Sequence, residues 1–430
     1  MTRVLCAVPL LLSLSSLAPA AAPDVSPDPK SLAVPDEELS KARELVQLLG
    51  SEQFHEREQA ERDLEKMGRT ARAALLEGVN NDPSPEVRSR CHALLPRATA
   101  LEMKARLDTF LADEDGKYDH DLPGWNEFRS LARDEWSLFG YTLFSDPSLD
   151  RSARKVFAEL LATPINRQVV MAVGGPESEL GPLAAARRQE LYNQKYGRII
   201  VGGGIVARPT TRREPTIDDI AALLFAEAHA PAGGGGVRTV SISILLSSSG
   251  FYNAVKASDE KGKVYQALIA AWIDSRQDPQ EMYSALTVAG TQLAMPDQAC
   301  RLALRLLDAK GAQVYHRGQA AATLARFGNK GHIPLLEKTI GDSSVLTTLR
   351  RNVVKDGKNE LVTNEIQMRD VALAVSIVLA GQKPEDFGFQ DQFKNNNNPN
   401  ISFSYTRYLL DEDQRKAAFD KWKAWREKNP

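Results

Sequence analysis

An acidic cluster between positions 113 and 121 is the first stretch in which residue types and spacing could do chemistry. Oxygen ligands at alternate positions suit Ca²⁺. The calcium loop of an EF-hand, however, needs Gly at its sixth position and Glu at its twelfth, whereas Gly116 stands fourth here and Gly124 twelfth. A solvated loop between helices is therefore the prediction we favour. The weak metal candidates in the cluster are Asp113, Asp115, Asp119 and Asp121.

Other residues that could catalyse a reaction do not occur in the spacing that catalysis needs. No histidines form the His-Glu-x-x-His pattern, and Ser247-Ser-Ser-Gly250 lacks the Gly two positions before a serine that a hydrolase elbow requires. The Gly runs at 202–204 and 233–236 lack the residues that complete a phosphate loop. We predict no catalytic residue, no cofactor and no metal. The histidines are His55, His92, His120, His229, His316 and His332.

Two alternatives of other classes stay open. A hydrolase or carbohydrate-active enzyme would have its site in the irregular middle of the chain, near Trp125, Tyr192 and Tyr196. Against it stands the lack of any paired-carboxylate or Ser/His arrangement that can be assigned to neighbouring elements. The other alternative is a structural subunit of a surface assembly.

The elements that would position any binding residue come from an internal repeat. A shift of 260 positions aligns residues 57–84 with 317–344 without a gap, and ten of these 28 columns are identical. Self-similarity of this kind is typical of stacked repeat proteins, and the shared pattern predicts a helix, a Gly turn and a second helix. The identical pairs are Arg57/Arg317, Gln59/Gln319, Ala60/Ala320, Leu64/Leu324, Gly68/Gly328, Leu75/Leu335, Leu76/Leu336, Glu77/Glu337, Asp82/Asp342 and Ser84/Ser344.

A shorter signature recurs within this repeat: Ala, then Leu four positions later, then Leu eleven positions after that. We expect the small Ala to let helices approach and both leucines to fill the seams between hairpins. Gly68 and Gly328 should supply a positive φ after the first helix, and the segments at 81–85 and 341–344 should cap the helix that follows each. The signature occurs at Ala60/Leu64/Leu75, Ala289/Leu293/Leu304 and Ala320/Leu324/Leu335, and Arg88/Cys91/Leu95 repeats Arg57/Ala60/Leu64 after 31 residues.

With these motifs the chain resembles the HEAT-repeat family, specifically exported bacterial HEAT-like proteins. The resemblance implies an all-α fold, a HEAT-like α-solenoid of stacked helical hairpins that recognises a partner on an extended surface. The repeats are expected at 37–112 and 280–345. An acidic loop with helices should occupy 113–165, and an irregular helical segment with long Gly-rich loop insertions should occupy 166–279. Within that segment, 237–244 alternates in a strand-like way, which leaves one short hairpin open.

Residues 346–430 are expected to form a C-terminal helical cap. The apolar helix over 365–379 would be covered by Phe387, Phe389, Trp422 and Trp425, which closes the end of the solenoid. The tail at 414–428 has an aromatic stripe with basic residues opposite, a pattern that also suits an anionic membrane surface. Its Asp and Glu residues favour a helix docked on the solenoid.

The first 20 residues are predicted to be a signal peptide, and 21–36 a Pro-rich linker. Arg3, the apolar run at 4–17 and Ala18-Pro-Ala20 form the charge, core and cleavage site of an export signal. The protein is thus expected to be exported, to the periplasm or the extracellular space. Cys91 and Cys300 would then be buried thiols or, alternatively, a disulfide.

Composition points to a protein partner of unknown identity. There are 54 Lys and Arg residues against 56 Asp and Glu residues, with the signs interspersed, so no long-range field would attract nucleic acid. No second apolar run is long enough to span a membrane. The sequence therefore predicts a non-enzymatic protein-binding scaffold that is more than half helical with almost no strand.

Overall fold

The computed structural model is mostly helical and divides into two compact units, one ending at His120 and the other beginning at Asp121. The signal peptide expected at 1–20 lies outside the described residues, as does the Asn-rich segment at 395–398. The structure describes residues 27–132, 137–138, 141–142, 147–196, 199–201, 204–206, 212–230, 242–247, 249–355, 358–392 and 404–429.

The first unit is built from two helical pairs around one apolar core. Small and apolar side chains at helical spacing pack between the helices, among them Ala60, Leu64, Leu75 and Cys91. Burial raises the pKa of the Cys91 thiol to about 11, and both Cys91 and Cys300 are free thiols. The elements are a 3₁₀ turn at Pro29–Leu32, α1 (Asp36–Leu48), α2 (Phe54–Met67), a second 3₁₀ turn at Gly68–Ala71, α3 (Arg72–Asn81) and α4 (Pro85–Ala112).

An arginine contact marks the 31-residue step in this unit. Arg57 and Arg88 each donate through Nη1 to the two carbonyl oxygens six and five residues earlier, in the loop before their own helix. Arg167 donates through Nε and Nη2 to carbonyls at the same two offsets, which here belong to the last two residues of the preceding helix. The pattern therefore extends into the segment expected to be irregular. The acceptors are Ser51 and Glu52 at 2.7 and 3.2 Å, Asp82 and Pro83 at 2.6 and 3.0 Å, and Leu161 and Ala162 at 2.9 and 3.5 Å.

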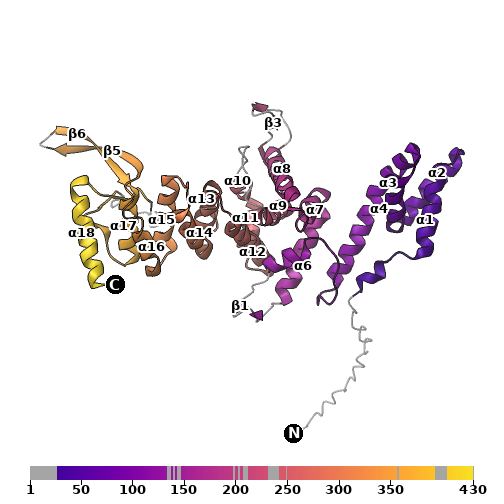
Figure 1. Ribbon diagram of the computed structural model, residues 1–430, viewed down its shortest axis with the longest axis horizontal. Coiled ribbons are helices and arrows are strands. Elements are labelled where there is room, and N and C mark those ends of the chain that lie inside the picture. The colour runs from indigo at the N-terminus through magenta and orange to yellow at the C-terminus, as the bar shows by residue number, and fades with distance from the viewer. Residues whose placement is uncertain are drawn as a thin grey trace, which may run out of the picture. The chain divides into compact units, whose positions relative to one another are not determined.

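The second unit begins with helices gathered around α9, which is buried over nine consecutive residues. Helices α6, α7, α8, α11 and α12 all contact α9, so this apolar helix is the core of the segment (Figure 1). Short antiparallel strand pairs lie beside the helices, including β3–β4 where a loop was expected. The elements are α5 (Trp125–Ala132), β1 (Ser137–Leu138), β2 (Tyr141–Thr142), α6 (Pro147–Ala162), α7 (Pro164–Met171), α8 (Glu177–Tyr196), β3 (Ile199–Val201), β4 (Gly204–Val206), α9 (Ile217–His229), α10 (Ser243–Leu246), α11 (Ser249–Lys256) and α12 (Glu260–Ser275).

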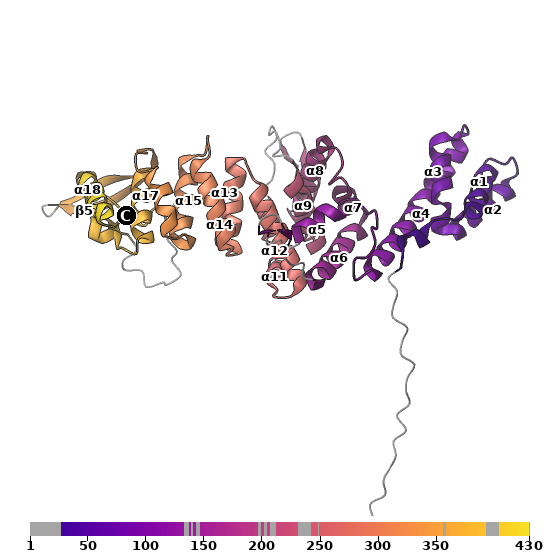
Figure 2. The ribbon, with the colours of Figure 1, turned by 60° about the horizontal axis from the view of Figure 1, so that its bottom comes forward.

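The rest of the second unit stacks helices in pairs. Figure 2 shows α13, α15 and α17 following one another, and α15 packs against both of the others. Helix α14 packs on α12, α13 and α15. The elements are α13 (Pro279–Thr287), a π-helical turn at Val288–Gln292, α14 (Pro296–Asp308), α15 (Val314–Phe327), a 3₁₀ turn at Lys330–His332, α16 (Ile333–Glu337), β5 (Val345–Lys355), β6 (Lys358–Gln367), α17 (Met368–Leu379), a 3₁₀ turn at Pro384–Phe387, β7 (Gln390–Asp391), β8 (Tyr408–Leu409) and α18 (Glu412–Lys428).

The expected helical cap is wrong over its first 22 residues, where the chain forms the long antiparallel hairpin β5–β6. This hairpin extends away from the helices (Figure 1), and its base packs on α15 and α17. Residues 365–367 end β6, so α17 starts at Met368 and not at Glu365. The turn at Asp342 and Ser344 caps no following helix, because β5 begins at Val345. The carbonyls of Asp342 and Ser344 instead accept from Arg369 N and Met368 N at the start of α17.

The aromatic residues of the C-terminal region do pack where the sequence predicts. Phe387, Phe389 and Trp422 are buried in one cluster with Leu373 and Ile377 of α17, and Trp425 packs partly buried against it. Trp422 Nε1 donates to Glu337 at 3.0 Å, which joins α18 to the end of α16. Among the described residues, none of the helices has the length and apolar content needed to cross a membrane.

The two repeat glycines differ from expectation. Gly68 has φ 58°, as predicted, but Gly328 has φ −76°. Gly328 is required for a different reason: a Cβ there would lie 2.5 Å from the carbonyl oxygen of Leu324. Gly68 is therefore needed for its positive φ, and Gly328 is needed because a side chain there would clash with the carbonyl of Leu324.

Candidate binding groove

The acidic cluster is a hydrogen-bonded loop. Asp113 is buried and accepts from the backbone N–H groups of Lys117 and Tyr118, both at 3.0 Å, and from His120 Nε2 at 2.9 Å. Asp115 is exposed and pairs with Lys117 at 3.2 Å, while Asp119 and Asp121 are exposed and have other partners. Across the described part of the chain, no three His, Cys, Asp or Glu side chains are arranged to hold a metal ion.

The residues of the enzymatic alternative fall into two separate groups. Trp125 is buried among Phe128, Phe157 and the Arg154 guanidinium. Tyr192 packs on Tyr196 along α8, with ring centroids 4.7 Å apart. Ser247 is exposed and donates to the Ile244 carbonyl. Trp125 thus belongs to an apolar core and Tyr192 and Tyr196 to a helix surface.

His316 is the histidine whose surroundings are most unusual. It is fully buried on α15, stacked on Tyr283 with centroids 4.4 Å apart and in contact with Tyr315. Neither ring nitrogen has a hydrogen-bond partner in the described part of the protein. Burial lowers the pKa of His316, against the opposite effect of Asp278, so the ring is kept neutral.

A groove with a volume of about 600 Å³ lies between α13, the C-terminal half of α14 and α16. Its apolar surface comes from all three helices, and one of its leucines, Leu335, is 40 % exposed. The groove is lined by Gln277, Pro279, Met282, Leu304, Arg305, Leu307, Asp308, Ala309, Lys310, Leu335, Lys338 and Thr339.

The length of α16 explains why this surface is open. Helix α14 has 13 residues, whereas α16 has five and is followed at once by a turn that leads into β5. A helix of five residues can cover only part of a helix of 13. Leu304 is therefore half-buried and Leu335 exposed, although both were predicted to fill seams between hairpins. Leu302, Leu306 and Leu336 fill the core instead.

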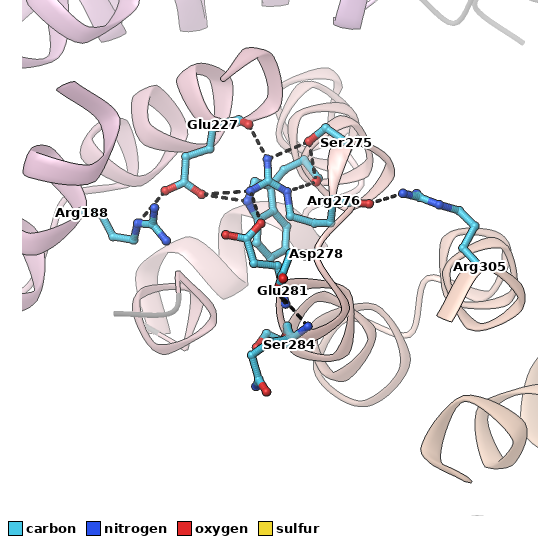
Figure 3. A network of polar contacts seen from close by, with 10 residues as sticks. Arg188, Glu227, Ser275, Arg276, Asp278, Glu281, Ser284 and Arg305 are labelled. Carbon is cyan, nitrogen blue, oxygen red and sulfur yellow. Dashed lines mark hydrogen bonds and ion pairs between the residues drawn. The ribbon is translucent and has the colours of Figure 1, made fainter. Parts of the chain in front are cut away.

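Behind one wall of the groove, a buried polar network centres on Glu227 of α9 (Figure 3). Arg188 of α8 pairs with one carboxylate oxygen at 2.9 Å, and Trp272 Nε1 donates to the other at 3.0 Å. Arg276 approaches that second oxygen at 3.8 Å and also donates to the Glu227 carbonyl. Burial raises the pKa of Glu227, while the two arginines act in the opposite direction. A buried carboxylate held by two cations is costly to disturb, so this network fixes α12 on α9.

The same network fixes the loop that borders the groove. Arg276 also pairs with Glu281 of α13 at 3.3 Å, and Asp278 caps α13 by accepting from two backbone N–H groups. Arg305 of α14 donates to the carbonyl of Arg276 (Figure 3) and also to that of Asp274. Gln277 and Pro279, which line the groove, are thus held between these bonds. The groove has a preorganised wall, which lowers the entropy cost of binding.

A second hollow, of about 560 Å³, lies between α5, α6, α11, α12 and the start of α14. It also contains lysines, but Lys256 donates to Tyr252 and Lys263 pairs with Glu260 at 2.9 Å. The lysine side chains of this hollow therefore already have partners within the protein. Of the basic residues at the α14–α16 groove, Lys310 and Lys338 differ from them in this respect.

No model of a known protein family, no curated protein and no solved structure matches this chain. The candidate site therefore rests on its own geometry. Sequence reasoning found Leu304 and Leu335 but assigned them to buried seams, and it did not single out Lys310, Lys338 or the network around Glu227. The short interval between Ile333 and the strand-like run from Val345 was the available signal, because it leaves room for little helix.

Proposed function

We propose that this protein is a non-enzymatic, HEAT-like helical-repeat scaffold that holds a protein partner on the surface of its stacked helices. The observation that carries the proposal is the groove between α14 and α16, an apolar surface between helices that the described residues leave uncovered. Open grooves between packed helices are a common way to bind segments of other proteins.

The repeated arginine contact supports the HEAT-like part of the proposal. Arg57, Arg88 and Arg167 use the same carbonyls relative to their own positions, so a common hairpin unit accounts for three places in the chain. Stacked units of one kind present a continuous surface to an extended partner. The export signal predicted from the sequence at 1–20 favours action outside the cytoplasm, in the periplasm or extracellular space.

The experiment is reconstitution with the partner. The protein should be tagged, expressed in its source cells, and recovered from the extracytoplasmic fraction with whatever protein co-purifies at constant stoichiometry. That protein is then purified separately and mixed with the wild type and with Leu335→Glu. A one-to-one complex by light scattering, weakened by Leu335→Glu, is the expected result.

The matched control is Leu76→Glu in the first unit, because Leu76 is 38 % exposed, close to the 40 % of Leu335. Both variants should melt within a few degrees of the wild type and only Leu335→Glu should lose the complex. Large self-assembled particles without a second protein would favour the structural-subunit alternative. Turnover of a panel of glycoside and ester substrates would favour the enzyme.

A further inference from the structure

The charges at the α14–α16 groove are unbalanced. Its lining includes three basic side chains, those of Arg305, Lys310 and Lys338, and one acidic side chain, that of Asp308. Lys310 and Lys338 are exposed, and their side-chain amino groups form no hydrogen bond or ion pair with any described residue. Arg305 is bound to two backbone carbonyls, so no carboxylate neutralises its charge there. The groove therefore presents an apolar surface with an excess of positive charge.

We propose that this groove binds a short acidic segment of a partner protein, in which two or three apolar side chains enter the groove and flanking Asp or Glu side chains meet Lys310 and Lys338. The inference rests on the proposed scaffold function and specifies the chemistry of the partner. Leu304, Leu307 and Leu335 provide the apolar contacts, above the buried side chain of Met282. Apolar anchors at the centre with charges at the edge form the usual division of labour in such interfaces.

The position of the two lysines decides how much their charges contribute to binding affinity. Lys338 is the C-cap of α16, and Lys310 follows the end of α14, so each lies near the negative end of a helix dipole. The dipoles offset part of the positive charge. Affinity should therefore come mainly from the apolar anchors, while the lysines select acidic over basic flanks and make binding weaken with salt.

A peptide fits this surface better than other ligands do. Pockets for small molecules have a few polar groups converging on an enclosed apolar space. Here the polar groups come from six positions, on α14, directly after α14 and α16, and in the loop before α13, and the apolar residues come mainly from three helices. Nucleic acid is disfavoured because the whole chain has a formal net charge of −2.

The test is selection from a random 12-residue peptide library displayed on phage, with the full chain as bait. Selected peptides are then synthesised with a fluorophore and titrated by anisotropy. We expect the enriched sequences to be acidic and to contain at least two large apolar residues. Their affinity should fall about tenfold with Leu335→Glu and about tenfold with Lys310→Glu/Lys338→Glu together.

Two controls separate the groove from general effects. Leu76→Glu matches the exposed leucine, and Lys416→Glu/Lys423→Glu matches the charge change with exposed lysines of α18 that do not line the groove. Both should bind the selected peptides as the wild type does. Enrichment of neutral or basic peptides would overturn the proposal. So would equal binding by the groove variants, or no enrichment over the Leu335→Glu bait.

These outcomes are distinguishable from failure of the scaffold function. If the full-length partner still binds Leu335→Glu with unchanged affinity, the scaffold proposal stands and the groove assignment falls. If neither a stoichiometric partner nor any selected peptide is found, both fall.

Discussion

The two copies of the helical repeat are alike in their first helix and opposite in their second. Ala60 and Leu64 in the first unit are buried, and so are their counterparts Ala320 and Leu324. The following pair of leucines behaves differently. Leu75 is 1 % exposed and Leu76 38 %, whereas in the second copy Leu335 is 40 % exposed and Leu336 is fully buried.

The element that follows each copy explains the reversal. In the first unit, the second helix α3 has ten residues and packs along α4, which has 28. In the second unit, α16 has five residues and leads into the strand β5. The face of a helix that becomes buried is the one that lies against a neighbour with apolar surface. For α16 that neighbour is α17, which packs against it. The comparison teaches that the first leucine of the same pair can lie in a core in one copy and line an open groove in the other.

The largest effect is expected where the copies agree. Leu64→Ala and Leu324→Ala should each lower the free energy of unfolding by about 2 to 5 kcal/mol, because each removes a fully buried side chain between helices. Urea denaturation followed by circular dichroism measures both. A neutral result for either variant would mean that the aligned first helices do not share one packing role.

For the two adjacent leucines of the second helix, the cost of substitution should be reversed between the copies. Leu75→Ala and Leu336→Ala should cost about 2 to 5 kcal/mol each, whereas Leu76→Ala and Leu335→Ala should cost about 1 kcal/mol or less, since they are partly exposed. The same urea experiment reports all four. Equal losses for Leu335→Ala and Leu336→Ala would contradict the reversal and remove the physical basis of the groove.

The smallest expected difference between the copies is in how their stability depends on pH. The second copy has the buried His316 where the first has the partly exposed Glu56. Burial holds the pKa of folded His316 below its ordinary value of 6.5, so the unfolded chain binds this proton more tightly. The stability that neutral His316 provides is complete above about pH 6.5 and is lost as the pH falls from there through the lower folded pKa.

The check is the pH dependence of the unfolding free energy between pH 8 and 5. His316→Gln should flatten the part of the curve below about pH 6.5. His92→Gln, a change at an exposed histidine of the first unit, should leave the curve unchanged. If the wild type and His316→Gln give parallel curves, His316 takes up its proton without cost and the environment described for it is wrong.

Local pattern was enough to predict the first helix of each repeat and the C-terminal aromatic cluster. Ser84, for example, caps α4 as expected by accepting from Val87 N. Asp82 and Asp342 both accept from the N–H of the serine two residues later, so the repeat extends to this turn. Such contacts lie within a few residues of one another, and a sequence encodes them directly.

The hairpin β5–β6 was missed although the sequence has a signal for it. Asp356-Gly357 stands between two runs rich in Val, Leu and Thr, which is typical of a tight hairpin turn. For the groove, the short interval between Ile333 and Val345 predicts a short helix but not which of its leucines is exposed. Whether Leu335 or Leu336 is buried depends on which distant element covers α16, and helical spacing alone does not decide between adjacent residues.

The central claim is that the second copy of the repeat, and not the first, holds the partner. The most direct measurement is photo-crosslinking of the full chain in the extracytoplasmic fraction, with p-benzoylphenylalanine at position 335 or, separately, at position 76. The claim predicts a single strong adduct from position 335, mapped by mass spectrometry to an acidic segment of one partner protein, and none from position 76. Equal adducts from both positions, or an adduct from position 76 alone, would contradict it.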